Sequence, residues 1–283
     1  MLRRLLIGVL LAYLLLCGAM FVLQRQLQYR PDIAALDPTL AARHGFMQET
    51  LATPDGQTLM AWWSPPQDAM SPVILYLHGN GAHLGARAER LAALHADGAG
   101  VLALSWRGYG GSSGSPDEAG LLTDARSAWQ ALKQRAPRQP ALIYGESLGT
   151  TVAVMVAAEV QPDALILDSS FDSALAVAAG HYPWLPVSWL LKDTYRADLA
   201  APRVRAPVLL IHCRDDPVTP LPHAQALSRL FPAAEPMLLV EDRCHVPKYA
   251  RYRSAVQTLL GRDLAAAGAH PKTTRPEDEP RSR

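Results

Sequence analysis

The sequence predicts an α/β protein whose mostly parallel sheet is covered by helices on both faces. Short apolar runs recur along the chain without polar alternation, which is typical of strands buried on both sides. Segments with helical patterning separate these runs, and loops rich in Gly, Asn, Asp and Ser follow them. The 283 residues, 49% of them hydrophobic, suit one large core rather than two.

An antiparallel hairpin opens the predicted sheet. Residues 47–52 and 58–64 are strand-like runs on either side of Thr53-Pro54-Asp55-Gly56, which is a turn sequence. Continuous apolar runs then supply the remaining strands. These runs are residues 73–77, 101–104, 141–144, 164–167, 208–211 and 236–240.

Helical patterns connect the strands. Residues 82–97 form one such pattern, which a glycine closes. Pro116 is expected to start another helix, with Asp117 and Glu118 in its first turn, where the helix dipole favours acidic groups. The apolar run 151–160 predicts a third helix.

The alternation breaks between Asp168 and Pro207, where apolar and aromatic residues crowd an insertion of about residues 169–205. One interpretation is a helical excursion that only shields one end of the sheet. The other is a small cap whose aromatic side chains line an acyl-binding pocket. The pocket residues predicted on this second interpretation are Tyr109, Phe171, Trp184 and Trp189.

The N-terminus carries an uncharged, mostly apolar run from Leu5 to Leu23. Its length as a helix, roughly 28 Å, is close to the hydrocarbon thickness of a bilayer. An uncleaved signal anchor is favoured because no clear Ala-x-Ala site follows. A signal peptide cleaved near Cys17-Gly18-Ala19 and a buried core helix are the alternatives.

The orientation of this anchor depends on basic residues at its two ends. Arg3 and Arg4 precede the apolar run, and Arg25 and Arg30 follow it. The count is nearly balanced and favours an N-terminus in the cytoplasm. We therefore expect a single-pass protein with its main domain on the periplasmic side of a bacterial inner membrane.

The motif Gly145-Glu146-Ser147-Leu148-Gly149 lies between an apolar strand and an apolar helix. Such a strand–turn–helix exposes the serine hydroxyl on a strained corner at the top of a sheet, and the glycines let strand and helix approach. Ser147 is therefore the predicted nucleophile.

A serine nucleophile needs a base and an acid that orients the base. In the order Ser, Asp, His, the acid follows the strand after the insertion and the histidine follows the last strand. His245 is the predicted base and Asp216 the predicted acid, with Asp215 and Asp168 as alternatives. A cap for the helix after Pro220 is another role for the Asp215–Asp216 pair.

The oxyanion of an acyl-transfer intermediate needs two backbone N–H donors. Leu148, directly after the nucleophile, supplies one of them. The loop His78-Gly79-Asn80-Gly81 follows the first buried strand, and the N–H of Asn80 is the predicted second donor. The other interpretation is that this glycine-rich loop only lets the chain reverse direction.

Several functional classes find no support in the sequence. Lys and Arg total 27 against 26 Asp and Glu, and no basic block suggests a nucleic-acid partner. The glycines around Gly79 and Gly81 lack dinucleotide spacing, and no phosphate loop is present. Without Cys-x-x-Cys or His-x-x-x-His, neither a metal nor a cofactor is predicted.

The motifs together resemble the α/β-hydrolase superfamily, and more narrowly its membrane-anchored bacterial branch similar to the Bem46, ABHD13 and ABHD17 hydrolases, grouped with serine aminopeptidase-like sequences. The resemblance covers nearly all of residues 25–262. It implies Ser147, Asp216 and His245 as the triad and Asn80 with Leu148 as the oxyanion hole. The matching segments are Tyr29-Arg30-Pro31, Leu77–Gly81, Trp106–Pro116, Tyr144–Gly149, His181–Pro186, Ile211–Pro220 and Cys244-His245.

Two cysteines depart from the family pattern. Cys213 follows His212 where the family usually has glycine, and Cys244 replaces the usual glycine before the catalytic histidine. A Cys213–Cys244 disulfide would tie the acid loop to the base loop and fit an oxidising compartment. Two small buried apolar residues are the alternative.

The sequence therefore divides into a membrane anchor (1–24), a catalytic domain (25–262) and a C-terminal tail (263–283) expected to be disordered. The predicted activity is hydrolysis of an ester or thioester, or of an amide, in a small or lipid-like acyl substrate. A carboxylesterase or lipase is favoured, followed by an acyl-protein thioesterase and a peptidase. A cofactor-free haloperoxidase or lyase and a non-catalytic, membrane-tethered binding module are the further alternatives.

Overall fold

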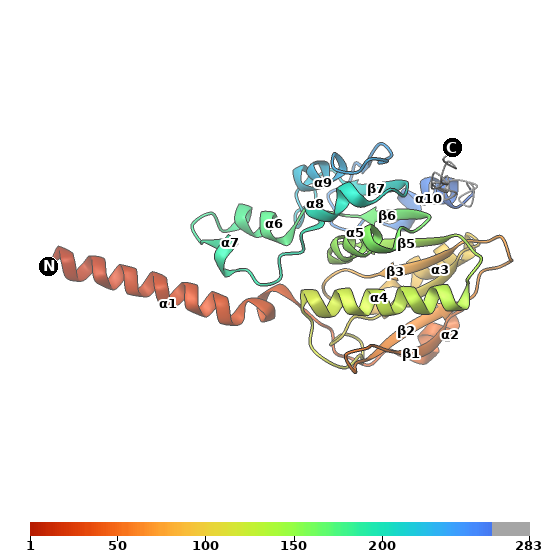
Figure 1. Cartoon of the computed structure of the whole chain (residues 1–283), viewed down its shortest axis with the longest axis horizontal. Coiled ribbons are helices and arrows are strands. Elements are labelled where there is room, and N and C mark those ends of the chain that lie inside the picture. Colours follow the sequence, from red (N-terminus) through yellow and green to blue (C-terminus); the bar gives the residue numbers. More distant parts are fainter. Residues whose placement is uncertain (262–283) are drawn as a thin grey trace, which may run out of the picture.

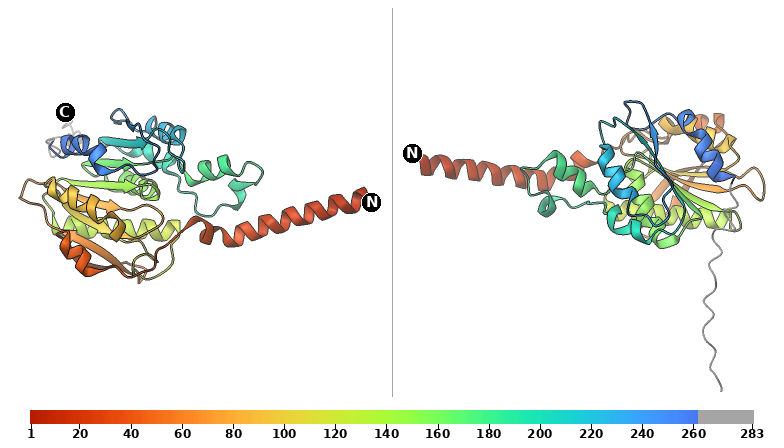
Figure 2. Two further views of the ribbon diagram at one scale, coloured as in Figure 1. Left: turned by 180° about the vertical axis from the view of Figure 1, so that it is seen from behind. Right: turned by 90° about the horizontal axis from the view of Figure 1, so that it is seen from above.

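The computed structural model describes residues 1–261 and contains one eight-stranded sheet in the order β1-β2-β4-β3-β5-β6-β7-β8. Figures 1 and 2 show this sheet between two layers of helices, with one long helix projecting from the domain. The predicted tail, residues 263–283, lies outside the described residues. The strands are β1 (Met47–Ala52), β2 (Thr58–Ser64), β3 (Val73–Leu77), β4 (Gly100–Leu104), β5 (Ala141–Glu146), β6 (Ala164–Asp168), β7 (Val208–Cys213) and β8 (Leu238–Val240).

The sheet has the predicted, mostly parallel arrangement. The β1–β2 hairpin pairs antiparallel with β4, and every pairing from β4 to β8 is parallel. The carboxyl ends of β5, β6, β7 and β8 therefore meet at one edge. The loops that carry the predicted nucleophile, acid and base all leave the sheet at this edge.

Alternate residues of one strand pack into two separate cores. In β3, Val73, Leu75 and Leu77 join the cluster beneath α4 (Glu118–Arg135), α5 (Leu148–Val160) and α8 (Ala197–Ala200). Ile74 and Tyr76 join the opposite cluster, beneath α3 (Ala88–Ala96) and α10 (Arg253–Leu260). Because both faces are covered, the strands are continuous apolar runs. The two smaller helices α2 and α9 span Pro38–Arg43 and Leu221–Ser228.

Two helix starts differ from the predictions. The segment 82–97 is a 3₁₀ turn, η1 (Leu84–Arg87), followed by α3, because the His83 side chain accepts a hydrogen bond from Gly85 N–H and caps the turn. Helix α4 begins after Asp117, whose carboxylate accepts from Gly120 N–H. Asp117 is thus the cap of this helix rather than part of its first turn.

The insertion contains the short helices α6 (Ala174–His181) and α7 (Val187–Leu190), then α8 and a 3₁₀ turn, η2 (Ala201–Arg203). In Figure 1, α6 and α7 project from the carboxyl edge of the sheet. None of the residues of α6 is buried, although the helix is almost entirely apolar. We call residues 169–205 the cap.

Helix α1 spans Leu2–Gln28 and is long and apolar enough to cross a membrane. Only Cys17 and Gln24 of this helix are buried, so the core-helix alternative is wrong. The helix fits a single-pass anchor, and it continues four residues beyond the predicted boundary at residue 24.

Candidate active site

Ser147 occupies a sharp turn between β5 and α5. Its backbone has φ 50° and ψ −117°, a strained conformation for a residue with a side chain. Gly149 makes the turn possible, because a Cβ at this position would lie 2.1 Å from the Leu77 carbonyl oxygen. A Cβ on Gly145 would lie 2.6 Å from the Gly149 carbonyl oxygen. The two glycines thus permit the close approach that the motif predicts.

Ser147, His245 and Asp216 form one hydrogen-bonded chain. Ser147 Oγ lies 2.7 Å from His245 Nε2, and His245 Nδ1 lies 2.8 Å from Asp216 Oδ2. With its proton on Nδ1, the ring donates to the carboxylate and accepts from the serine hydroxyl. This arrangement can remove a proton from the serine during nucleophilic attack.

The Asp216 carboxylate is held by more than the histidine. Burial alone would raise its pKa, but the hydrogen bonds from His245 and from the N–H groups of Thr219 and Val218 lower the pKa overall. Thr219 Oγ1 also donates to Asp216 Oδ2 at 2.9 Å. Asp216 is therefore ionised when it faces the ring. Its partners Val218 and Thr219 precede α9, whose N-terminus has no side-chain cap, so Asp216 does not cap this helix.

The two alternative acids lie elsewhere. Asp215 is exposed to solvent. Asp168 is fully buried and accepts hydrogen bonds from Arg90 at 2.7 Å and from Tyr252 at 2.8 Å. Burial raises the pKa of Asp168 despite the nearby Arg90. Asp168 therefore belongs to a buried ionic cluster behind the nucleophile.

Glu146 is the second acidic member of this cluster. It lies 2.6 Å from Arg87 and 3.2 Å from Arg90. Burial would raise its pKa, but the two guanidinium groups outweigh burial and lower the pKa to about 2. Arg90 also donates to the Pro247 carbonyl at 2.7 Å. The cluster thereby connects the turn at Ser147 to the loop that carries His245.

The predicted oxyanion loop lies against Ser147. A Cβ on Gly79 would be 3.0 Å from the Ser147 Cβ. Leu148 is the first residue of α5, where a backbone N–H has no acceptor within the helix. Asn80, Ser147 and Leu148 all line the same cavity. A substrate carbonyl bound there would lie near both predicted donors.

The side chain of Asn80 has a separate role. Its Nδ2 donates to the Gln28 carbonyl at 2.6 Å, and its Oδ1 accepts from Arg30 N–H at 2.9 Å. Tyr109 Oη donates to the same Oδ1 at 2.8 Å. The predicted oxyanion loop is therefore hydrogen-bonded to the segment that leaves the end of α1.

The cavity above Ser147 has a volume of about 410 Å³ and a mostly apolar lining. Phe171 lines it as predicted, whereas Trp184, Trp189 and Tyr109 do not. Trp184 and Trp189 are 55% and 86% exposed, so they lie on the surface rather than in the cavity. Tyr109 is fully buried, and its hydroxyl donates to Asn80 instead of lining the cavity. Helix α1 supplies Met20, Gln24, Leu27 and Gln28 to the wall instead.

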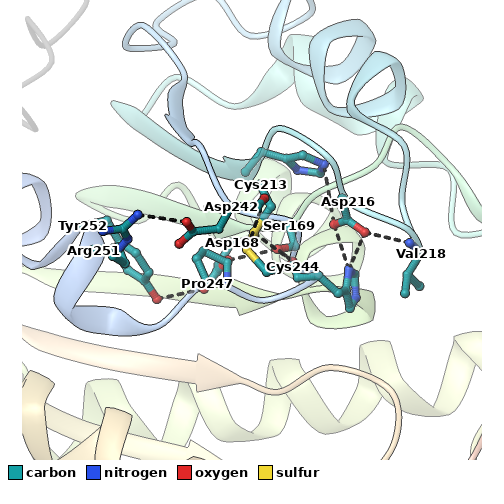
Figure 3. The surroundings of a disulfide bond; sticks show 12 residues. Asp168, Ser169, Cys213, Asp216, Val218, Asp242, Cys244, Pro247, Arg251 and Tyr252 are labelled. Carbon is teal, nitrogen blue, oxygen red and sulfur yellow. Dashed lines mark hydrogen bonds and ion pairs between the residues drawn. A yellow bond between two sulfur atoms is a disulfide. The ribbon is translucent and has the colours of Figure 1, made fainter.

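Cys213 and Cys244 are joined by a disulfide, with a Cα–Cα distance of 5.6 Å (Figure 3). The bond connects the end of β7 to the residue before His245. Ser169 Oγ donates to the His245 carbonyl from the neighbouring loop. In Figure 3 the disulfide lies between Asp216 on one side and Asp168 with Tyr252 on the other. The loops of the predicted acid and base are thus covalently tied.

Comparison with known proteins agrees with this architecture. An esterase from Pyrococcus furiosus superposes with a TM-score of 0.62 at 20% identity, covering 84% of this chain and 96% of that one. Est1E from Butyrivibrio proteoclasticus gives 0.62 at 16% identity, covering 77% and 99%. The family model for serine aminopeptidase, S33, matches residues 68–187. An uncharacterized protein of Mycobacterium tuberculosis is 39% identical over 216 residues, which is 75% of this chain and 76% of the relative.

The chain belongs to the α/β-hydrolase family. Lysophosphatidylserine lipase ABHD12 of Danio rerio is 35% identical over 179 residues, which is 56% of this chain and 47% of the relative. The hydrolase thus spans about half the length of its ABHD12 relatives. The family relationship supports a hydrolase activity.

Some residues of this hydrolase site were not predicted. Thr219 follows Asp216 by three residues, a spacing at which side chain and backbone commonly hydrogen-bond, and this signal could have been used. Ser169 and Arg90 donate to carbonyl groups of the His245 loop from other parts of the fold. No sequence pattern near either residue signals these contacts. The wall residues of α1 were missed because their contacts with the cap join distant segments, as Gln24 and Leu190 do across 166 residues of the chain.

Proposed function

We propose that this protein is a serine hydrolase that cleaves carboxylic esters of single-chain amphiphiles. The observation that carries the proposal is the chain from Ser147 Oγ through His245 to Asp216, with both linking distances below 3 Å. The apolar cavity above Ser147 and the long apolar helix beside it support a lipid-like substrate.

The residues divide the reaction as follows. His245 Nε2 takes the proton of Ser147 as Oγ attacks the ester carbonyl, and the N–H groups of Leu148 and Asn80 stabilise the oxyanion. The protonated ring then donates its proton to the leaving alcohol, which leaves an acyl-serine. Water, deprotonated by the same ring, releases the carboxylic acid and restores Ser147. Asp216 keeps the ring oriented throughout.

The lining of the cavity favours an anionic or neutral lipid over a peptide. Among the described residues that line it, Arg30 is the single member of the Asp, Glu, Lys and Arg group. An aminopeptidase would need a carboxylate to bind the substrate ammonium group, and this lining offers none. The lysophosphatidylserine lipases among the relatives act on a substrate with one acyl chain and an anionic head group, which suits the same lining.

A fluorophosphonate probe tests the proposal directly, because it labels a serine that is activated by a base near an oxyanion hole. We expect the full-length protein to be labelled and Ser147→Ala to lose the label. Ser127→Ala, on α4, is the matched control and should be labelled like the wild type. Failure of the folded wild type to react would overturn the proposal, and p-nitrophenyl esters of increasing length would otherwise rank the acyl chains.

A further inference from the structure

The outer part of the cap is unusually apolar for a surface segment. Residues 174–191 contain no Asp, Glu, Lys or Arg, and Asp172 and Lys192 flank the segment. Within it, Tyr182, Trp184 and Trp189 are exposed large hydrophobic side chains. Water is a poor solvent for such a surface, so a covering environment is expected. We call residues 174–191 the cap tip.

The cap tip lies against α1 at three successive levels. Tyr13 Oη donates to the Trp184 carbonyl at 2.9 Å. About one turn further on, Cys17 packs against Leu185 and Val187. Gln24 then donates to the Leu190 carbonyl at 2.9 Å. Figures 1 and 2 show α6 and α7 on the same side of the domain as the projecting helix.

A polar collar marks where the apolar contact ends. Gln24 Oε1 accepts from Lys192 N–H at 2.7 Å, and Arg25 Nε lies 2.9 Å from Asp193 Oδ2. The Lys192 ammonium lies 4.1 Å from the centre of the Phe21 ring. Charged groups of this kind are typical of a membrane–water boundary. The collar therefore places that boundary near residue 24 of α1.

The depth of the cap tip follows from the helix. From Gln24 back to Tyr13 the helix rises about 16 Å, which is close to the hydrocarbon thickness of one leaflet. If α1 crosses a bilayer with its collar at the interface, the residues beside Tyr13 and Cys17 are at the same depth. Trp184, Leu185 and Val187 of the cap tip are these neighbours.

We infer that the cap tip is immersed in the membrane leaflet adjoining the catalytic domain. The occupant of its exposed apolar surface is phospholipid rather than another protein, because that surface continues the lipid-facing surface of α1 and ends at the same collar. This inference about immersion does not depend on the proposed function.

Immersion also sets the route of a substrate, and this part rests on the proposed function. The cavity above Ser147 is walled by Met20 and Leu27 of α1 and by Val177 and Ala178 of α6. Val177 and Ala178 belong to the cap tip, and Met20 and Leu27 lie about one turn on either side of Gln24 of the collar. An acyl chain can therefore move from the leaflet to the nucleophile between α1 and α6 along a mostly apolar wall, which identifies the substrate class as leaflet-resident amphiphiles.

Tryptophan quenching by brominated lipids tests the immersion. The full-length protein is placed in nanodiscs of dibrominated phosphatidylcholine and compared with the double variant Trp184→Phe, Trp189→Phe. The other four tryptophans lie in the catalytic domain and are at most 9% exposed. We expect the wild type to lose emission in brominated lipid and the double variant to lose much less. Equal fractional quenching of the two proteins would overturn the inference.

A second experiment tests the route. Trp189→Asp is compared with Met70→Asp, which is also an apolar-to-acidic change but at an 81% exposed position outside the cap. We expect Trp189→Asp to lower kcat/KM at least roughly tenfold on a long-chain ester embedded in nanodiscs, because an aspartate is expelled from hydrocarbon. Hydrolysis of soluble p-nitrophenyl butyrate should not change, and Met70→Asp should affect neither substrate.

The outcomes separate the two proposals. Equal loss on both substrates, or no loss on either, would overturn entry through the leaflet. A wild type that hydrolyses neither ester would overturn the proposed function, while the quenching result would still decide whether the cap tip is immersed.

Discussion

The Cys213–Cys244 disulfide closes a segment of the chain that includes α9 and the loops of Asp216 and His245, with a sequence separation of 31. Cross-linking a loop of this length removes chain entropy from the unfolded state, which corresponds to about 3.7 kcal/mol at 25 °C. We therefore expect reduction, or the double change Cys213→Ser, Cys244→Ser, to lower the free energy of unfolding by roughly 3 to 4 kcal/mol. That is a large share of the stability of a typical domain.

The assay is guanidinium unfolding of the full-length protein in detergent, with and without reductant. The midpoint should fall after reduction, and the double-serine variant should match the reduced wild type. Cys17→Ala removes the free cysteine of α1 and should leave the effect of reductant unchanged. Alkylation of Cys213 and Cys244 without reductant, or an unchanged midpoint after verified reduction, would refute the reasoning.

Three other perturbations probe the site. Gly149→Ala should abolish folding or activity, because its Cβ would meet a β3 carbonyl oxygen at 2.1 Å, whereas Gly180→Ala, with open space, should be tolerated in the same expression and activity assay. Asp216→Asn should lower kcat by roughly three to four orders of magnitude, and Asp215→Asn should leave the kinetics unchanged. Glu146 has a folded pKa of about 2, below its ordinary 4.5, so its stabilising contribution is complete above pH 4.5 and is lost as pH falls toward 2. Over that range Glu146→Gln should flatten the fall of the unfolding midpoint with pH, and an unchanged slope would contradict this assignment.

The sheet could be predicted from the sequence because its signals are local. Apolar runs such as 73–77 are buried on both faces, and the Gly-x-Ser-x-Gly turn needs only the close approach of one strand and one helix. The order of Ser147, Asp216 and His245 along the chain also predicted which strand ends would carry them. The structure brings these three side chains together.

The cap could not be predicted in the same way. An aromatic residue in an apolar insertion can line a pocket or face an outer apolar environment, and the sequence does not distinguish these cases. Phe171 does the first, whereas Trp184 and Trp189 lie on the exposed surface, where we infer the second. The contact of Gln24 with Leu190 spans 166 residues, so no periodicity within either segment signals it.

The fastening of Asn80 to Gln28 and Arg30 has a practical consequence for anyone who removes the hydrophobic helix to obtain a soluble protein. Such a truncation would delete the α1 wall of the cavity and the Gln28 carbonyl that accepts a hydrogen bond from the Asn80 side chain, and it would leave Arg30 beside a free chain end. The site of the shortened protein would therefore differ from the site of the full-length protein. Loss of activity after truncation would therefore report on the architecture of the site as much as on access to lipid.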